Sequence, residues 1–89
     1  VSAEVTNILY VIARRSQQQA VMALLEAELA RCNYPASDVD VRPFGSDEVE
    51  IEAILAATSV DGDELDALVA RLSTSTLVVQ AFWSPSTTD

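Results

Sequence analysis

The chain has 89 residues, enough for one small domain, and 49% of them are hydrophobic, which is more than a disordered chain would show. Fourteen Asp and Glu residues stand against five Arg residues, with no Lys and no His, so the net charge is −9. This acidity argues against nucleic acid and against an anionic membrane surface as partners, because both need a basic protein surface.

The first third of the chain predicts a strand followed by a helix. Apolar residues run from Ile8 to Ala13, so residues 6–14 are expected to form a central strand that is at least partly covered on both faces. The run Ser16-Gln17-Gln18-Gln19 fits a capping box at the start of a helix. Pro35 is expected to end that helix, because a proline disfavours helical conformation in the residue before it. The buried stripe of this helix consists of Val21, Met22, Leu25, Leu29 and Cys32.

Two alternating stretches, at residues 37–44 and 48–57, predict a β-hairpin. A three-residue loop, Gly45-Ser46-Asp47, sets Val41 opposite Ile51, so that the apolar residues of both strands share a face. The same register places a favourable pair, Arg42 and Glu50, and an unfavourable pair, Asp40 and Glu52, on the other face.

A second helix and a final strand complete the pattern. Asp61 is expected to cap the helix with Glu64 as its reciprocal partner, and the strand is expected at residues 77–83. In that strand Phe82 and Val78 are expected on one face and a second set of apolar residues on the other. One set should therefore face the helices, and the other should stay partly exposed. The buried helix stripe is Leu65, Leu68, Val69 and Leu72, and the second strand set is Leu77, Val79, Ala81 and Trp83.

The order strand, helix, strand, strand, helix, strand is the βαββαβ arrangement of the ferredoxin-like fold. We therefore predict an α+β domain with a four-stranded antiparallel sheet and both helices on one face. The domain is expected to span residues 6–84, after an N-terminal lead-in at 1–5 and before a polar, frayed tail at 85–89. No apolar run approaches the ~20 residues of a membrane helix, and the residues Val1-Ser2-Ala3-Glu4 lack the features of a signal peptide.

The residue types argue against catalysis. Without His the usual general base is missing, and a Ser or Cys nucleophile lacks its partner. We expect no catalytic residue, no cofactor and no metal site, and the single cysteine, Cys32, is weak evidence for a reducing compartment. Among weaker alternatives, Arg14 and Arg15 favour ion pairs with the acidic surface over an anion site. A cation site is likewise less favoured than a screened acidic face for Asp38, Asp40 and Glu52.

Several stretches give the chain a resemblance to a known family. They are Leu9-Tyr10-Val11-Ile12-Ala13-Arg14-Arg15, Val49-Glu50-Ile51-Glu52-Ala53, Leu65-Asp66-Ala67-Leu68-Val69-Ala70-Arg71-Leu72 and Leu77-Val78-Val79-Gln80-Ala81-Phe82-Trp83. Over residues 6–84 the chain resembles the C-terminal cytoplasmic, ACT-like domain of MgtC/SapB inner-membrane proteins. The resemblance implies a cytoplasmic appendage of a bacterial membrane protein that is linked to low-magnesium adaptation and virulence.

The expected function is a non-enzymatic regulatory or protein-interaction domain of such a membrane protein. The expected partner is another protein or the membrane domain of the same chain, docked on the open sheet face near the first and last strands. We expect no direct membrane insertion of this segment and a monomer or weak dimer. The alternative is an ACT-type sensor of amino acids, although the turn Arg14-Arg15-Ser16-Gln17 lacks the glycine that often occurs there in ACT domains.

Overall fold

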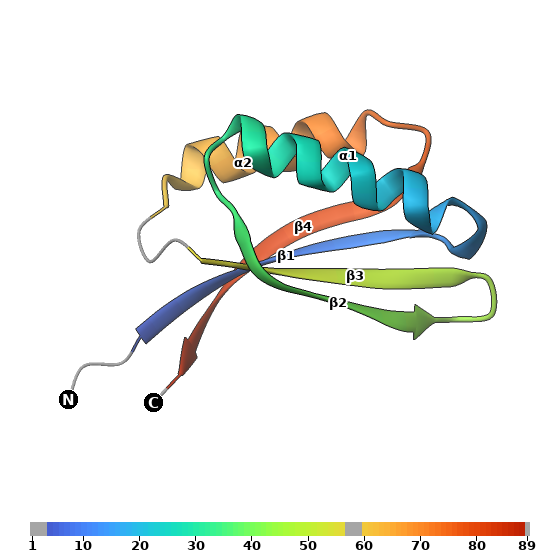
Figure 1. Cartoon of the computed structure of the whole chain (residues 1–89), viewed down its shortest axis with the longest axis horizontal. Coiled ribbons are helices and arrows are strands. Elements are labelled where there is room, and N and C mark those ends of the chain that lie inside the picture. The colour runs from blue at the N-terminus through green and yellow to red at the C-terminus, as the bar shows by residue number, and fades with distance from the viewer. Residues whose placement is uncertain (1–3, 57–59, 89) are drawn as a thin grey trace.

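The computed structural model describes residues 4–56 and 60–88 and contains two helices above one sheet (Figure 1). The elements in chain order are β1 (Glu4–Arg14), the 3₁₀ turn η1 (Arg15–Gln17), α1 (Gln18–Arg31), β2 (Ala36–Phe44), β3 (Glu48–Leu55), α2 (Gly62–Ser73) and β4 (Val78–Thr88). Ala57, predicted as the last residue of the third strand, lies outside the described residues. So do residues 1–3 of the lead-in and Asp89 of the tail.

The four strands form one antiparallel sheet in the order β2-β3-β1-β4, and both helices cover the same face of it. The predicted α+β, ferredoxin-like arrangement is therefore confirmed. β1 and β3 are central, which explains the continuous apolar run of β1, whereas β2 and β4 form the edges.

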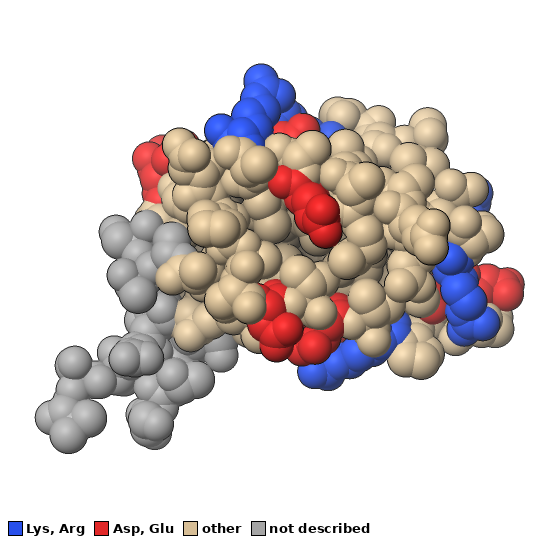
Figure 2. Space-filling view, viewed as in Figure 1, with Lys and Arg blue, Asp and Glu red and all other residues tan. Residues whose placement is uncertain are grey.

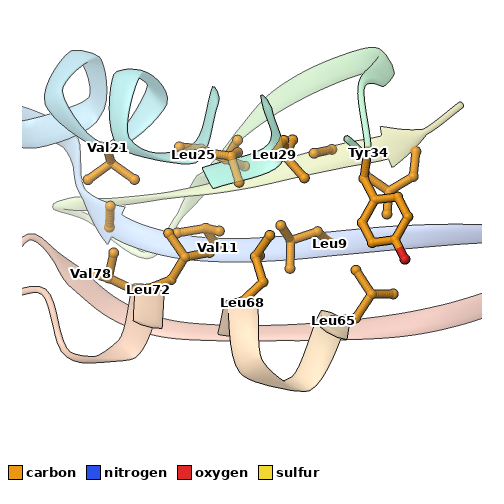
Figure 3. Close-up of a cluster of buried hydrophobic side chains, with 14 of the residues drawn as sticks. Leu9, Val11, Val21, Leu25, Leu29, Tyr34, Leu65, Leu68, Leu72 and Val78 are labelled. Atoms are coloured by element: carbon orange, nitrogen blue, oxygen red, sulfur yellow. The ribbon is translucent and has the colours of Figure 1, made fainter. Parts of the chain in front are cut away.

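The hydrophobic core lies between the helices and the covered face of the sheet (Figure 3). β3 alternates as predicted, with Val49, Ile51, Ala53 and Leu55 buried and the residues between them half-buried. The most completely buried large side chains come from β1, β3 and both helices, namely Leu9, Val11, Val21, Leu25, Ile51, Leu65, Leu68 and Leu72.

The β2–β3 register agrees with the prediction. Val41 pairs with Ile51, and the loop Gly45-Ser46-Asp47 joins the strands with Gly45 at a φ of +68°. That positive φ is the conformation for which glycine is favoured. From Asp38 to Phe44, β2 side chains of one parity therefore share the core face with those of β3, and the other parity shares the open face. A register shift before Asp38 places Ala36 opposite the buried Leu55.

The N-terminus of α1 differs from the predicted capping box. The helix begins at Gln18 after the η1 turn, Ser16 lies within that turn, and in the described part of the chain no side chain caps this helix end. The Arg15 amide instead donates to the Asp47 carbonyl over 2.8 Å. This long-range backbone bond to the hairpin loop accompanies a turn that local sequence alone did not predict.

The C-terminus of α1 is set by Asn33, which lies two residues before Pro35. Asn33 adopts a φ of 59°, its amide donates to the Ala30 carbonyl, and the Tyr34 amide donates to the Leu29 carbonyl over 2.9 Å. This is a Schellman motif with asparagine in the left-handed position. It turns the chain so that Tyr34 is buried in the core.

The last strand is longer and less regular than predicted. β4 runs to Thr88, and its end pairs with the start of β1, from Asn7 opposite Pro85 to Glu4 opposite Thr88. The predicted frayed tail is therefore wrong over 85–88, because pairing with β1 supplies the backbone partners that a polar composition does not reveal. Near the other end of β4 a register shift makes a β-bulge.

The bulge changes which residues of β4 face the core. Ile12 pairs with Gln80, but the next residue, Ala13, pairs with Val78, so Val79 is the extra residue. Val78 is buried with the helix-facing side chains, whereas Val79 is 53% exposed. The prediction that Val78 shares the face of Phe82 is wrong, because strict alternation fails at a bulge.

Candidate interaction surface

The sheet face opposite the helices is organised by strand register. Directly opposed residues place Asp40, Glu52, Tyr10 and Phe82 in one transverse row across β2, β3, β1 and β4. Two carboxylates therefore occupy one half of this row and two aromatic rings the other half. We call this surface, which the helices leave uncovered, the open face.

The aromatic half of the open face contains a stacked pair. The ring centroids of Tyr10 and Phe82 lie 4.9 Å apart with an interplanar angle of 18°. Phe82 is 38% exposed and Tyr10 is half-buried, while Ile12 beside them is almost fully buried. An offset stack of this kind holds both rings in place and leaves part of Phe82 exposed to solvent.

The acidic half of the open face is only partly neutralised. By register it carries five carboxylates and two arginines, Arg14 opposite Glu48 and Arg42 opposite Glu50. Arg42 reaches diagonally to Glu52, with 3.3 Å between Nη2 and Oε2. Acidic side chains gather on the lower side of the molecule in Figure 2, with basic side chains next to them. The remaining carboxylates of this half are Asp38 and Asp40.

Arg42 and Glu50 are opposed as predicted, but the ion pair forms with Glu52 instead. Asp40 lies opposite Glu52, and this like-charge pair was predicted to be unfavourable. The diagonal bond from Arg42 brings a positive charge next to both carboxylates. Within residues 4–56 and 60–88, no group of three or more acidic, Cys or His side chains is arranged to hold a metal ion.

The polar network around Tyr34 joins the end of α1 to the start of α2. The Tyr34 hydroxyl accepts from the Asp61 amide over 3.0 Å and donates to Glu64 Oε1 over 2.9 Å. Asp61 caps α2 as predicted, through a 2.9 Å bond from the Asp63 amide. The expected return bond from Glu64 to the Asp61 amide is relayed through the tyrosine hydroxyl.

The hydrogen bonds of Tyr34 affect its proton affinity in opposite directions. The bond from the Asp61 amide lowers the pKa of Tyr34, whereas desolvation and the adjacent Glu64 carboxylate raise it. The net pKa of Tyr34 is raised above its ordinary value. The Tyr34 hydroxyl forms hydrogen bonds with both the Asp61 amide and the Glu64 carboxylate, so we assign this network a structural role.

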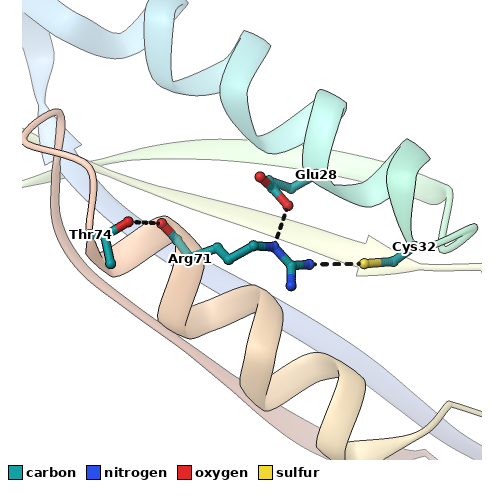
Figure 4. Close-up of polar contacts among 4 residues, drawn as sticks. All are labelled: Glu28, Cys32, Arg71 and Thr74. Atoms are coloured by element: carbon teal, nitrogen blue, oxygen red, sulfur yellow. Dashed lines mark hydrogen bonds and ion pairs between the residues drawn. The ribbon is translucent and has the colours of Figure 1, made fainter.

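Arg71 on α2 forms hydrogen bonds to the end of α1 (Figure 4). Its Nε donates to Glu28 Oε1 over 2.8 Å, and its Nη2 donates to Cys32 Sγ over 3.2 Å. The bond to Glu28 is the main reason that the pKa of Arg71 is raised. A further bond, from Trp83 Nε1 to Asp66 Oδ1 over 2.8 Å, ties β4 to α2.

Among the described residues, one groove borders the end of the open face and another lies away from it. The first, of about 880 Å³, lies between the β1–α1 turn and the hairpin loop, and it is lined by Arg14, Arg15, Asp47 and Glu48 among others. Arg14 and Arg15 were predicted to form ion pairs with the acidic surface, but within the described residues neither forms one, although Arg14 lies opposite Glu48. The second, of about 560 Å³, lies between α1 and β2 and is lined mostly by apolar side chains, with Glu26 at its margin.

The fold places the chain in a known structural class. Over 93% of this chain and 100% of the other, it superposes on the ACT domain of GTP pyrophosphokinase from Chlorobium tepidum with a TM-score of 0.63 and 7% identity. The de novo designed protein Foldit4 gives a TM-score of 0.57 at 19% identity, covering 99% and 98% of the two chains. These likenesses define an ACT-like α+β domain and say nothing about activity.

The family follows from a more specific match. The family model of the MGTC/SAPB C-terminal domain matches residues 8–83, so the chain belongs to this family. The C-terminal domain of MgtC from Mycobacterium tuberculosis has the same fold, with a TM-score of 0.80 and 21% identity over 97% of this chain and 92% of that one. No curated protein matches the chain. In the described ranges, no helix has the length and apolar character needed to cross a membrane.

The structure brings together residues that the sequence suggested only separately. The sequence indicated that apolar residues of the first and last strands share the open face, but it did not pair Tyr10 with Phe82. The predicted strand order already indicated that these two strands are in contact, because β1 and β4 are neighbours in a βαββαβ sheet. What was missing was the register, which the bulge at Val79 shifts.

Proposed function

We propose that the domain is a non-enzymatic regulatory or protein-interaction module of an MgtC-like bacterial membrane protein. It docks another protein, or the membrane portion of its own parent protein, on the β1–β4 side of the open face. The parent protein serves adaptation to low magnesium and, in a pathogen, virulence. The domain lies on the cytoplasmic side of the membrane. Family membership supports the attachment to such a parent protein.

The observation that carries this proposal is the stacked pair of Tyr10 and Phe82 on a face that the helices leave uncovered. Exposed aromatic side chains with polar surroundings are typical of protein-interaction surfaces. The residue composition supports a non-enzymatic role, since the chain has no His to act as a general base.

The proposal is tested by site-specific crosslinking in the full-length parent protein in its membrane. A photo-reactive phenylalanine analogue replaces Phe82 in one variant and Glu26, which is exposed on α1, in the control. We expect a crosslink from position 82 whose partner peptide is identified by mass spectrometry, and none from position 26. Equal yields at both positions, or no crosslink at position 82, would contradict docking on the open face.

The second candidate function is an ACT-type amino-acid sensor. The groove beside Arg14 and Arg15 favours it, because it adjoins the turn after the first strand and its arginines suit a carboxylate. Asp47 and Glu48 in the same lining oppose it by repelling an acid. A thermal-shift screen with free amino acids separates the two functions: a sensor is stabilised by its ligand, and that stabilisation is lost in the Arg15→Ala variant.

A further inference from the structure

We propose that the segment docking on the open face is cationic and carries an arginine, whose guanidinium group stacks on the face of Tyr10 that Phe82 does not cover and pairs with Glu50, beside the existing Arg42–Glu52 pair. This inference rests on the proposed function and adds the chemistry of the partner. The occupant is an arginine-bearing segment of a protein.

The geometry places aromatic and acidic groups within reach of one guanidinium. Tyr10 lies directly opposite Glu52, and Ile12, two residues further along β1, lies opposite Glu50. Neighbouring strands are about 5 Å apart, and diagonal neighbours, about 7–8 Å apart, are within reach of long side chains. A cation held within roughly 6 Å of the tyrosine ring centre is therefore also close to both carboxylates.

The carboxylates also define the charge of the occupant. Arg42 already binds Glu52 on this face over 3.3 Å, which shows that the acidic row accommodates a guanidinium. Within the described residues, Glu50 forms no ion pair although Arg42 lies opposite it. An apolar occupant would bury Glu50 without a partner, which is costly, and an anionic occupant would be repelled by a chain of net charge −9.

The aromatic pair discriminates arginine from lysine. The guanidinium is planar, stacks on aromatic faces and binds carboxylates through two parallel hydrogen bonds, whereas the lysine ammonium is a strongly hydrated point charge. A surface that attracted cations only through its net charge would bind the two residues equally. A preference for arginine that depends on Phe82 is therefore specific to this arrangement.

The experiment is an NMR titration of the 89-residue chain with capped hexa-arginine, hexa-lysine and hexa-glutamine peptides at low ionic strength. We expect amide shifts to concentrate in β1, β3 and β4 around Tyr10, Glu52 and Phe82. We expect the arginine peptide to bind about two- to fivefold more tightly than the lysine peptide, which is the effect of one exposed cation–π contact. The neutral glutamine peptide should not bind measurably.

Four variants separate the stacking contribution from general attraction. Phe82→Ala, which removes the ring that supports Tyr10, should reduce the preference for arginine, and Glu50→Gln should weaken both cationic peptides while leaving the Arg42–Glu52 pair in place. The matched controls are Val41→Ala, which has the same 38% exposure as Phe82 but lies on the helix side of β2, and Glu26→Gln on α1. Neither control should change the affinities. Dispersed amide spectra establish that each variant is folded.

Defined outcomes would overturn the inference. They are equal affinities for arginine and lysine, shifts spread over the whole acidic surface, or equal weakening by Glu26→Gln and Glu50→Gln. If crosslinks still form at position 82 in any of these cases, the proposed function stands and only the cationic partner is refuted. If the arginine preference holds but position 82 does not crosslink in the parent protein, the proposed function fails instead.

Discussion

The hydroxyl of Tyr34 links the Schellman end of α1 to the N-terminus of α2 through Asp61 and Glu64. One phenol group thus satisfies the amide of the capping residue and positions the carboxylate in the first turn. The network therefore connects the position of the α2 N-terminus to Tyr34.

We expect Tyr34→Phe to lower the free energy of unfolding and to change its pH dependence. Because the pKa of Tyr34 is raised in the fold, the native state keeps this proton where the unfolded chain loses it. The contribution is complete below the ordinary pKa of 10.0 and is lost as pH rises through the folded value. Urea denaturation between about pH 8 and pH 11 should show a steeper alkaline loss in the natural chain than in the variant. Parallel curves would contradict this.

Arg42 provides a second test at the scale of single residues. A double-mutant cycle with Arg42→Ala and Glu52→Ala should give a coupling free energy of about 0.2–1 kcal/mol, the range for cross-strand and exposed ion pairs. The guanidinium side chain is 62% exposed, so added salt should reduce the coupling. A cycle with Glu50→Ala in place of Glu52→Ala should give a smaller value. A larger coupling with Glu50 would mean that the diagonal pair is wrong.

At the scale of elements, the two glycines of the chain have different structural roles. Gly45 sits at a φ of +68° in the hairpin loop, where a side chain is strained. Gly62 is the first residue of α2, and a Cβ there would meet the Trp83 ring at an ordinary contact distance of 3.7 Å. One glycine is therefore required by the turn, and the other is replaceable.

We expect opposite effects from the two glycine-to-alanine substitutions. Gly62→Ala should stabilise the fold by about 0.4–1 kcal/mol, because alanine restricts the unfolded chain. Gly45→Ala should destabilise it by about 1–2 kcal/mol, the cost of a left-handed conformation with a Cβ. Chemical denaturation of both variants provides the comparison. If both substitutions shifted stability in the same direction, the assignment of one of these conformations would be wrong.

At the scale of the whole molecule, the acidic face invites the idea of magnesium binding. We expect no tight binding, because magnesium requires near-octahedral geometry and dehydrates reluctantly. The carboxylates of Asp38, Asp40 and Glu52 lie along two neighbouring strands, and Glu52 is already paired with Arg42. A chemical-shift titration with magnesium should give weak, distributed changes. Localised changes at these three residues that saturate at micromolar magnesium would refute the expectation.

Self-association is the second property of the whole molecule that can be measured. We expect sedimentation analysis to give a monomer or a weak dimer. The edge strand β2 contains Pro43 and exposes Asp38 and Asp40, all of which discourage edge-to-edge pairing. Two copies of net charge −9 also repel each other, so association should increase with salt. A tight dimer joined through the β2 edges would contradict this prediction.

Local sequence patterns predicted two helices and four strands in the order in which the structure has them. Side-chain alternation in 48–55, helical spacing in 18–31 and 62–73, and the glycine loop are local properties, readable without knowing any distant neighbour. They were sufficient for the fold class and for the parity of the β2–β3 pair. They also placed apolar residues of the first and last strands on the open face.

The features that depend on a distant partner could be recognised only in the folded chain. The continuation of β4 to Thr88 requires the start of β1, the η1 turn bonds to the hairpin loop, and the bulge at Val79 sends Val78 into the core. The stacking of Tyr10 on Phe82 joins residues at opposite ends of the chain. Local patterns carry no register for such pairs, because strand pairing is set by contacts between segments far apart in sequence.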